Sequence, residues 1–408
     1  MPTGTALAPD LREAIADLGR ADLVVGIPSF RNAGTIGHVI ASVRDGLRRR
    51  FAGVRGVIVN ADGGSDDGTR EVARTFDAED LRVVSGRYAG PSGKGSALRA
   101  VFEAVVTLEA RAGAVVDSDL RSITPPWAER LLNPIVDDRA DYVTPLYLRH
   151  KHDGTITNTV TYPVVRALYG VRVRQPIGGE FGFRASLAQR FLDEDVWDSD
   201  VARFGIDIFM TTTALASRAR IVQAALGTKV HDPKDPAQHL GPMFVQVLVS
   251  LCERVRAHLD VWSAVTGSRP VPVEGEPLTG EPDPVVVEPA RLDQAYARAS
   301  DDDRQRWTTV LCGEDRARFE LGARLGAVAD PDLERRWARL VYDLIAASIR
   351  EPASAAANAR AFLPLYLARV AMHVRAAEGM TSAQAEDLVE RQALAFESEK
   401  RHLLERSS

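Results

Sequence analysis

The chain has 408 residues, of which 45% are hydrophobic and 26% charged, and its net charge is −5. This length predicts two domains, and the composition is that of a globular protein with a packed core. The charge gives no reason to expect nucleic acid or a membrane surface as a partner, and no apolar run approaches the roughly 20 residues of a membrane-spanning helix. Two cysteines in helix-like sequence, Cys252 and Cys312, predict free thiols. An N-terminus unlike a signal peptide also favours a cytoplasmic protein.

Five short segments in the first part of the chain are almost continuously apolar, as buried β-strands are. They are residues 21–28, 54–62, 81–86, 112–119 and 140–148. Segments with apolar residues at helical spacing lie between most of them. These are residues 34–50, a stretch ending near 76, residues 95–109 and a segment beginning at Thr124-Pro125-Pro126. The alternation predicts an α/β fold, Rossmann-like, with a mostly parallel sheet and helices on both faces.

The pattern changes near residue 240, after which helical spacing dominates. We therefore predict an α/β domain over residues 1–240 and an α-helical extension over residues 241–408. A proline-rich stretch, residues 268–292, interrupts the helices and predicts an exposed loop. The extension is a candidate dimer interface or substrate lid.

Polar loops follow the first four predicted strands. They contain Pro28-Ser29-Phe30-Arg31-Asn32, residues 61–69 (ADGGSDDGT), residues 85–95 (SGRYAGPSGKG) and Asp117-Ser118-Asp119. The carboxyl ends of parallel strands meet at one edge of a sheet, and ligands bind at that edge. We therefore expect these four loops to form one binding site.

The fourth loop offers two carboxylates at the end of an apolar strand. In an extended segment residues i and i+2 point the same way, so Asp117 and Asp119 can face one ligand. Carboxylate oxygens suit Mg²⁺ or Mn²⁺, which often share a substrate diphosphate. The alternative is an ordinary turn, where Asp and Ser are common.

The third and second loops offer contacts to a nucleotide. Small residues around Gly93 and Lys94 let the backbone approach a phosphate, and the lysine adds a positive charge; the alternative is a solvated glycine turn. Asp62 stands where nucleotide-binding folds contact ribose or base. We interpret Asp66 and Asp67 as helix caps.

Three further motifs lie later in the chain. Residues 175–182 (QPIGGEFG) are rich in glycine, which suggests backbone close to a ligand or a plain turn. Asp207 stands in the first turn of an apolar helix, where it contacts a ligand or complements the helix dipole. His231 follows residues 226–230 (LGTKV) in a loop that could return to the strand ends, and it is a candidate metal ligand, although a lone histidine is more often structural.

Together these motifs resemble nucleotide-sugar glycosyltransferases of the GT-A fold. The order PSGKG, DSDL, QPIGGE, GID and then His resembles a retaining group that includes glucosyl-3-phosphoglycerate synthase, mannosylglycerate synthase and glucosylglycerate synthase. The resemblance covers about residues 22–245. It implies transfer of a hexose from a nucleoside-diphosphate sugar with the help of Mg²⁺ or Mn²⁺.

The resemblance also implies roles for individual residues. The donor nucleotide would be held by Pro28, Ser29, Phe30, Asn32, Asp62, Gly93, Lys94 and Ser118. Asp119 and His231 would bind the metal, with Asp117 secondary. Gly178, Gly179 and Glu180 would border the transferred sugar, and Asp207 would lie near sugar and acceptor, so that Asp207, Glu180 and Lys94 are the catalytic candidates. The family often has an acid where Asn32 stands, which leaves a UDP- or a GDP-linked donor open.

The acceptor is suggested by a pair of residues eight apart. In sequences similar to mannosylglycerate synthase, an Arg and a Thr at this spacing hold the glycerate carboxylate, and Arg149 and Thr157 match them. The phosphoglycerate enzymes carry an extra Arg where Thr155 stands here, so its absence favours D-glycerate over 3-phosphoglycerate. A glucosyl-3-phosphoglycerate synthase is the nearest alternative, and a sugar nucleotidyltransferase or a non-catalytic binding module are more distant ones.

Overall fold

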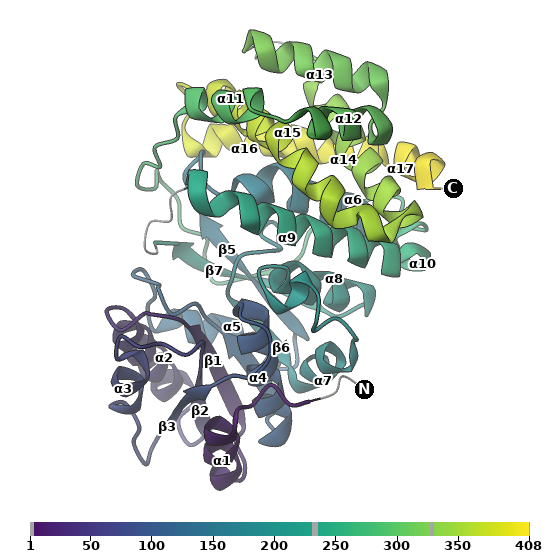
Figure 1. Cartoon of the computed structure of the whole chain (residues 1–408). Helices are drawn as coiled ribbons and strands as arrows, with labels where there is room; N and C mark the ends of the chain where they lie inside the picture. Colours follow the sequence, from purple (N-terminus) through teal and green to yellow (C-terminus); the bar gives the residue numbers. More distant parts are fainter. Residues whose placement is uncertain (1–3, 231–235, 327–329, 408) are drawn as a thin grey trace. The chain divides into compact units, whose positions relative to one another are not determined.

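The structure is a computed structural model that describes residues 4–230, 236–326 and 330–407 (Figure 1). Its contacts divide the chain into two compact units. The sheet unit comprises Met1–Leu148, Ile177–Pro233 and Val271–Leu278, and the helical unit comprises Arg149–Pro176, Lys234–Pro270 and Thr279–Ser408. This division differs from the predicted boundary at residue 240. Arg149–Pro176 packs with the C-terminal helices, and Val271–Leu278 adds a strand to the sheet.

The sheet unit is built on an eight-stranded sheet in the order β3-β2-β1-β4-β6-β5-β7-β8. The strands are β1 (Leu23–Ser29), β2 (Gly56–Asp62), β3 (Arg82–Arg87), β4 (Ala112–Val115), β5 (Tyr142–Leu148), β6 (Phe181–Arg184), β7 (Ile221–Thr228) and β8 (Val273–Glu274). The five predicted strands are all present, and β6, β7 and β8 were not predicted. Strand β6 runs antiparallel to β4 and β5, whereas the other paired strands are parallel.

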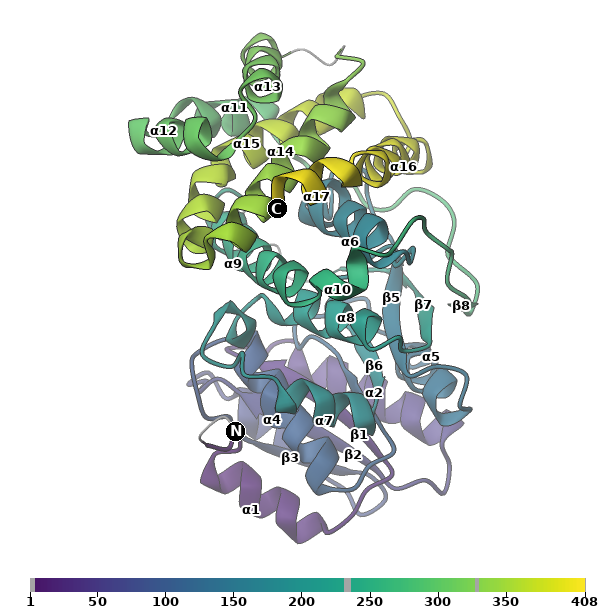
Figure 2. The same ribbon diagram turned by 90° about the vertical axis from the view of Figure 1, so that its right-hand side faces the viewer.

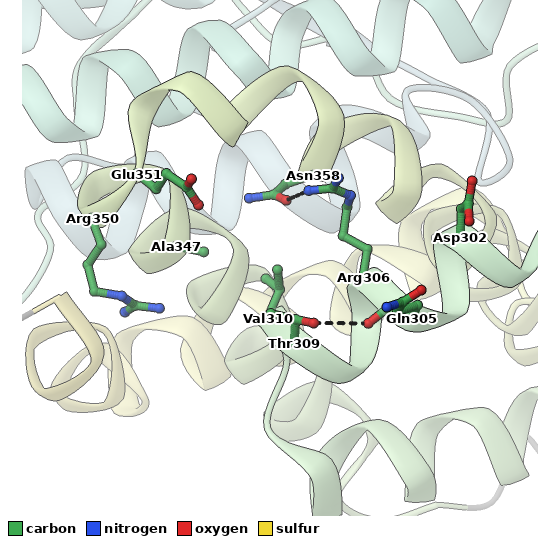
Figure 3. A pocket seen from close by; sticks show the side chains of 9 residues that line it. All are labelled: Asp302, Gln305, Arg306, Thr309, Val310, Ala347, Arg350, Glu351 and Asn358. Atoms are coloured by element: carbon green, nitrogen blue, oxygen red, sulfur yellow. Dashed lines mark hydrogen bonds between the residues drawn. The ribbon is translucent and has the colours of Figure 1, made fainter.

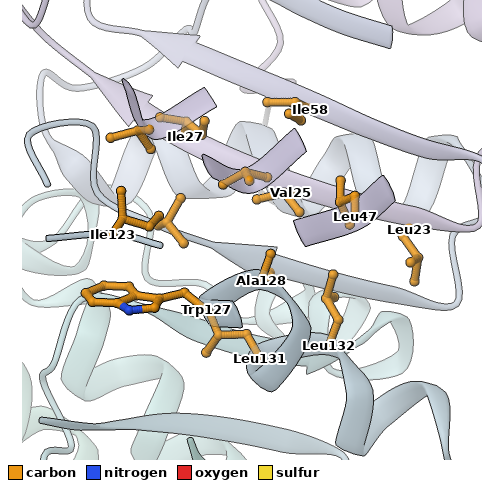
Figure 4. Packing of buried hydrophobic residues seen from close by; sticks show 14 of the residues in the cluster. Leu23, Val25, Ile27, Leu47, Ile58, Ile123, Trp127, Ala128, Leu131 and Leu132 are labelled. Carbon is orange, nitrogen blue, oxygen red and sulfur yellow. The ribbon is translucent and has the colours of Figure 1, made fainter. Parts of the chain in front are cut away.

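Helices cover both faces of this sheet (Figure 2). One set is α1 (Pro9–Leu18), α4 (Lys94–Thr107), α7 (Ala185–Asp193) and α8 (Ile206–Ala216); the other is α2 (Ile36–Arg50), α3 (Thr69–Arg74) and α5 (Pro126–Val136). Alternate β1 residues face opposite sides, so Leu23, Val25 and Ile27 pack against Trp127 and its neighbours on α5 (Figure 4). The predicted α/β class with a mostly parallel sheet is confirmed.

Helix α4 lies unusually close to the centre of the sheet. A Cβ on Gly26 of β1 would lie 2.3 Å from a methyl carbon of Val101, so only glycine fits there. This close packing sets the position of the N-terminal end of α4, where Lys94 is the first helical residue.

The helical unit confirms the predicted C-terminal helical part. Its elements are η1 (Thr157–Thr161), α6 (Tyr162–Tyr169), α9 (Pro236–Ala257), α10 (Leu259–Trp262), α11 (Pro289–Ala297), α12 (Asp301–Val310), α13 (Gly313–Leu325), α14 (Leu333–Arg350), η3 (Pro352–Ser354), α15 (Ala355–Ala376), α16 (Ser382–Ser398) and α17 (Lys400–Ser407). Trp337 of α14 packs at its centre between the rings of Phe319 and Phe362. Among the described residues, no helix combines the length and the apolar character needed to cross a bilayer.

A pocket of about 500 Å³ lies between α12, α14 and α15 within the helical unit (Figure 3). Arg306 and Asn358 face one another across it, with Nη1 donating to Oδ1 at 3.0 Å. Two acidic side chains, Asp302 and Glu351, and two basic side chains, Arg306 and Arg350, are among the residues that line the pocket. The nine described residues that line it include none of the predicted site residues.

Candidate active site

The loops that follow β1, β2 and β4 are hydrogen-bonded to one another. The Ser118 hydroxyl donates to Oδ1 of Asn32 at 2.8 Å, and the Thr35 hydroxyl donates to the Ser118 carbonyl at 2.8 Å. The Arg31 N–H donates to the Ser65 hydroxyl at 2.8 Å. The structure therefore brings these loops together at the carboxyl ends of the parallel strands, as the strand–helix alternation predicts.

The first loop begins where β1 loses one neighbour. Strand β4 pairs with β1 only as far as Gly26, so Pro28, which has no N–H, lies beyond the part of β1 that needs a donor on that side. Arg31 adopts a left-handed backbone conformation, with φ of 57°, and its guanidinium pairs with Asp66. The Phe30 ring is left 57% exposed at the rim. An exposed ring beside a polar loop is suited to stack on a base.

Asp62 shapes the second loop from inside the protein. Its side chain is fully buried, and one carboxylate oxygen accepts the N–H groups of Gly64 and Ser65 at 2.9 and 2.7 Å. The other oxygen accepts the Ser29 and Ser65 hydroxyls at 2.9 and 2.6 Å. The observed role of Asp62 is thus to fix the loop, and its direct contact with a nucleoside stays a prediction.

Lys94 is held at the rim by its position at the start of α4. The two flanking glycines allow this end of the helix to contact the backbone of residues 201–203: a Cβ on Gly93 or Gly95 would lie 2.6 or 1.8 Å from a carbonyl oxygen there. The Lys94 ammonium lies 2.8 Å from Oδ1 of Asp117 and 3.3 Å from Oδ1 of Asp207. The ammonium of Lys94 therefore pairs with one carboxylate from the loop after β4 and with one from α8.

A second lysine completes the cluster. Lys229, which follows β7 directly, lies 2.9 Å from Oδ2 of Asp117 and 2.9 Å from each carboxylate oxygen of Glu180. The Tyr147 hydroxyl also donates to Glu180. Glu180 immediately precedes β6, and because β6 runs antiparallel, its beginning lies at the same edge as the ends of β4 and β7. This reversed strand is the reason the Gly178-Gly179-Glu180 segment lies at the rim.

The cluster contains three carboxylates and two ammonium groups, all within the sheet unit. Burial alone would lower the pKa of Lys94, but Asp117, Asp207 and Glu180 outweigh it and raise that pKa above its ordinary value. Burial opposes ionisation of Asp117, yet Lys229 and Lys94 hold its pKa well below its usual range. Burial raises the pKa of Glu180 to about 7, against the influence of Lys229, and also raises that of Asp207. Perturbed neighbours of this kind are typical of functional sites.

The metal candidates differ in their surroundings. Both carboxylate oxygens of Asp117 are engaged by lysines, which leaves this side chain poorly suited to bind a cation directly. Asp119 is half-buried in the same loop and offers the oxygen donors that Mg²⁺ or Mn²⁺ prefers. His231 lies outside the described residues. Within the described part of the chain, no group of three or more His, Cys, Asp or Glu side chains is gathered as a metal site.

The acceptor candidates belong to the helical unit. Arg149 pairs with Asp153 at 2.8 Å, and Thr157 is buried at the start of η1. The Thr155 hydroxyl lies 2.7 Å from that of Tyr366. The side chain of Thr155 is thus part of the packing of this unit.

Sequence reasoning assigned no role to Lys229 or Tyr147. Tyr147 is the penultimate residue of β5 and Lys229 directly follows β7, and both strands are mostly apolar. A lysine directly after a buried strand is the signal that points to the rim. The partners of Lys229 are 49 and 112 residues away, so no local pattern connects them.

Residues 24–197 match the model of the family named Glycosyl transferase family 2. The matched residues begin in β1 and include the four loops and the Gly178-Gly179-Glu180 segment. Over these residues the chain is similar to family 2 glycosyltransferases, and the prediction of a glycosyltransferase of the GT-A class is confirmed. A comparison with curated proteins gave no match.

Solved structures of glucosyl-3-phosphoglycerate synthase from Mycobacterium tuberculosis are similar to part of the chain. One, in complex with Mn²⁺, UDP-glucose and phosphoglyceric acid, is 24% identical and has a TM-score of 0.46, over 61% of this chain and 86% of that one. Another, with Mg²⁺ and UDP, is also 24% identical with a TM-score of 0.46, over 62% and 85%.

Proposed function

We propose that this protein transfers glucose or mannose from a UDP- or GDP-linked donor to the 2-hydroxyl of D-glycerate. The observation that carries the proposal is the position of Lys94, at the N-terminal end of α4 and beside the Gly178-Gly179-Glu180 segment. Backbone N–H groups at a helix start and a lysine favour a diphosphate, and the carboxylates around it suit the hydroxyls of a sugar.

Each group of residues in the sheet unit has its own part in the proposed transfer. The rim loops hold the nucleoside, with Phe30 against the base and Ser118 near the ribose. Lys94 exchanges one carboxylate partner for an oxygen of the diphosphate and stabilises the charge that develops as the diphosphate leaves. Glu180 and Asp207 accept hydrogen bonds from hydroxyls of the sugar. Attack on the same face, with the departing phosphate taking the proton of the acceptor hydroxyl, retains the anomeric configuration and needs no carboxylate nucleophile.

Asp119 and His231 would hold a Mg²⁺ or Mn²⁺ ion. Such an ion would supply positive charge to the leaving diphosphate. The engagement of Asp117 by two lysines supports Asp119 as the carboxylate ligand and gives Asp117 a supporting place.

Arg149 and Thr157 are the proposed contacts for the glycerate carboxylate. D-Glycerate is favoured over 3-phosphoglycerate because Thr155 stands where an added arginine would contact a phosphate, and its hydroxyl already faces Tyr366. We further propose a cytoplasmic homodimer.

A donor-by-acceptor activity matrix tests the proposal. Purified protein is incubated with UDP-glucose, UDP-mannose, GDP-glucose or GDP-mannose, each with D-glycerate or 3-phosphoglycerate, in the presence of Mn²⁺, Mg²⁺ or a chelator. We expect one donor with D-glycerate to give a retained glycoside and a free nucleoside diphosphate, both lost with the chelator. Faster turnover of 3-phosphoglycerate would overturn the acceptor, release of pyrophosphate would indicate a nucleotidyltransferase, and no donor consumption would overturn the activity.

A further inference from the structure

Lys229 spans the ends of four strands. It follows β7, and its ammonium lies 5.7 Å from the centre of the Tyr147 ring on β5. It reaches Glu180 at the beginning of β6 and Asp117 beyond the end of β4, each at 2.9 Å. The side chain is only 6% exposed, so it is held by these contacts rather than by water. One ammonium thus connects β7, β5, β6 and β4.

The segment that Lys229 holds contains two successive glycines, both of them buried. Gly179 has a φ of 99°, and a Cβ there would lie 2.7 Å from both Oδ2 of Asp117 and Nζ of Lys229. Two successive glycines provide no side chains to fix the backbone and lose more freedom on ordering than other residues do. Lys229 supplies the shorter of two anchors: its ammonium donates to the Gly178 carbonyl at 2.9 Å, whereas Lys94 donates to the Gly179 carbonyl at 3.4 Å.

We infer that Lys229 is a positioning residue for sugar transfer: it fixes Glu180 and the Gly178–Gly179 backbone against Asp117. The inference rests on the proposed function, since it assigns this segment to the transferred sugar. Lys229 is paired with Oδ2 of Asp117 and with both oxygens of Glu180, whereas Lys94, with 16% of its side chain exposed, remains the cation that a diphosphate reaches. The two lysines therefore divide the cluster into a fixed part and a part that exchanges partners.

If Lys229 had a purely structural role, the expected result would be different. If Lys229 only neutralises buried carboxylates, any cation at this position restores activity. If it positions the segment, the shape of the cation matters as much as its charge, since an arginine fork cannot reproduce contacts made by a single nitrogen. The comparison of variants that keep charge, shape or neither distinguishes the two roles.

The test uses K229M, K229R and K229A in the full chain, with R82M as the matched control. Arg82 is the first residue of β3, so it lies at the edge of the sheet opposite to the candidate site. Its replacement removes a surface ion pair with Asp77. We expect kcat to fall about 100-fold in K229M and at least tenfold in K229R, as a misplaced reacting group does, while the KM for the donor changes less than threefold. R82M keeps the wild-type kcat.

Rescue with a small amine provides a second readout. Propylamine has the atoms that K229A lacks, so it restores kcat at least tenfold in K229A, whereas propanol of similar size does not. Wild-type kcat in K229R, or propanol rescue equal to that of propylamine, overturns the inference even where K229M folds poorly. In that case the wild type still transfers sugar and the proposed function stands. An inactive wild type overturns the proposed function and the inference together.

Discussion

The ammonium of Lys94 lies 2.8 Å from Oδ1 of Asp117, so the first acid of the Asp117-Ser118-Asp119 motif is paired with the lysine of the glycine-rich loop. The second oxygen of the same carboxylate is paired with Lys229. Two motifs that read separately as a metal site and a phosphate site are therefore one ionic cluster. The carboxylate at the end of the apolar β4 segment is balanced by charge inside the protein before any ligand arrives.

Replacing Lys94 with methionine removes the cation that faces the diphosphate. We expect K94M to lower kcat/KM for the donor about 10²–10³-fold, the usual cost of losing a preorganised group at developing charge. It also leaves Asp117 and Asp207 with one cation fewer, so we expect a loss of roughly 1–3 kcal/mol in the free energy of unfolding. Donor kinetics and urea denaturation measure the two effects, with R82M as control. A K94M enzyme within fivefold of wild type would rule out this role.

Gly179 is the position where backbone conformation and close contact act together. Alanine there must adopt a φ of 99° and meets Asp117 and Lys229 at 2.7 Å. Gly53 is the matched control, since it has a φ of 80° and a methyl group there would meet nothing within 4 Å. We expect G53A to cost about 1 kcal/mol from conformation alone, and G179A to cost more and to lower kcat. Equal losses of stability in thermal unfolding, with unchanged kcat, would show that the cluster tolerates the displacement.

Glu180 makes the stability of the protein depend on pH. Its pKa is about 7 in the folded protein and near 4.5 when unperturbed, so between these values the folded state binds more protons than the unfolded chain. Its contribution is fully present below about 4.5 and is lost as the pH rises through 7. Asp117, whose pKa is lowered, acts in the opposite sense: its contribution is present above about 3.8 and is lost below it.

The variant E180Q isolates this dependence because glutamine does not titrate. We expect the stability of the wild type relative to E180Q to decrease from pH 5 to pH 7, with a slope of at most about 1.4 kcal/mol per pH unit. Urea denaturation at unit pH intervals measures it, and E109Q, which removes an exposed carboxylate, is the control. A difference between wild type and E180Q that is the same at every pH would contradict the burial of an ionisable Glu180.

Replacing Asp62 distinguishes a carboxylate that stabilises the fold from one that contacts the ligand. D62N keeps one acceptor oxygen but turns an NH₂ group either toward the N–H groups of Gly64 and Ser65 or toward the hydroxyls of Ser29 and Ser65. We expect a loss of about 1–3 kcal/mol in the free energy of unfolding, because buried donors lose their partner. D66N, at an exposed ion pair with Arg31, should change stability by less than about 1 kcal/mol. If D62N is as stable as wild type and only the KM for the donor rises, Asp62 contacts the nucleoside.

The strands and loops were predictable from the sequence because their signals are local. Continuous apolar runs marked β1 to β5, and the alternation with helices placed Lys94, Asp117 and Asn32 at one edge. The contacts of Lys229 and the reversal of β6 were not predictable in this way. Strand β6 is only four residues long, Phe181–Arg184, and its direction is set by pairing with β4 and β5 rather than by its own pattern. Asp62 shows the reverse case: its position suggests a ligand contact, whereas its hydrogen bonds are those of a buried turn.

Replacing the two acids of the Asp117-Ser118-Asp119 motif should have different effects on metal affinity. Asp117 is engaged by two lysines, so D117N should leave the affinity for Mn²⁺ in the presence of UDP or GDP within about threefold of wild type, while lowering kcat through the displaced lysines. Asp119 offers a carboxylate ligand, and D119N should weaken Mn²⁺ binding at least tenfold, the order of loss seen when metal-site groups are removed. Titration of free Mn²⁺ measures this without relying on turnover. Equal weakening in both variants would mean that Asp117 leaves its lysines to bind the ion, and unchanged binding in D119N would place the metal elsewhere.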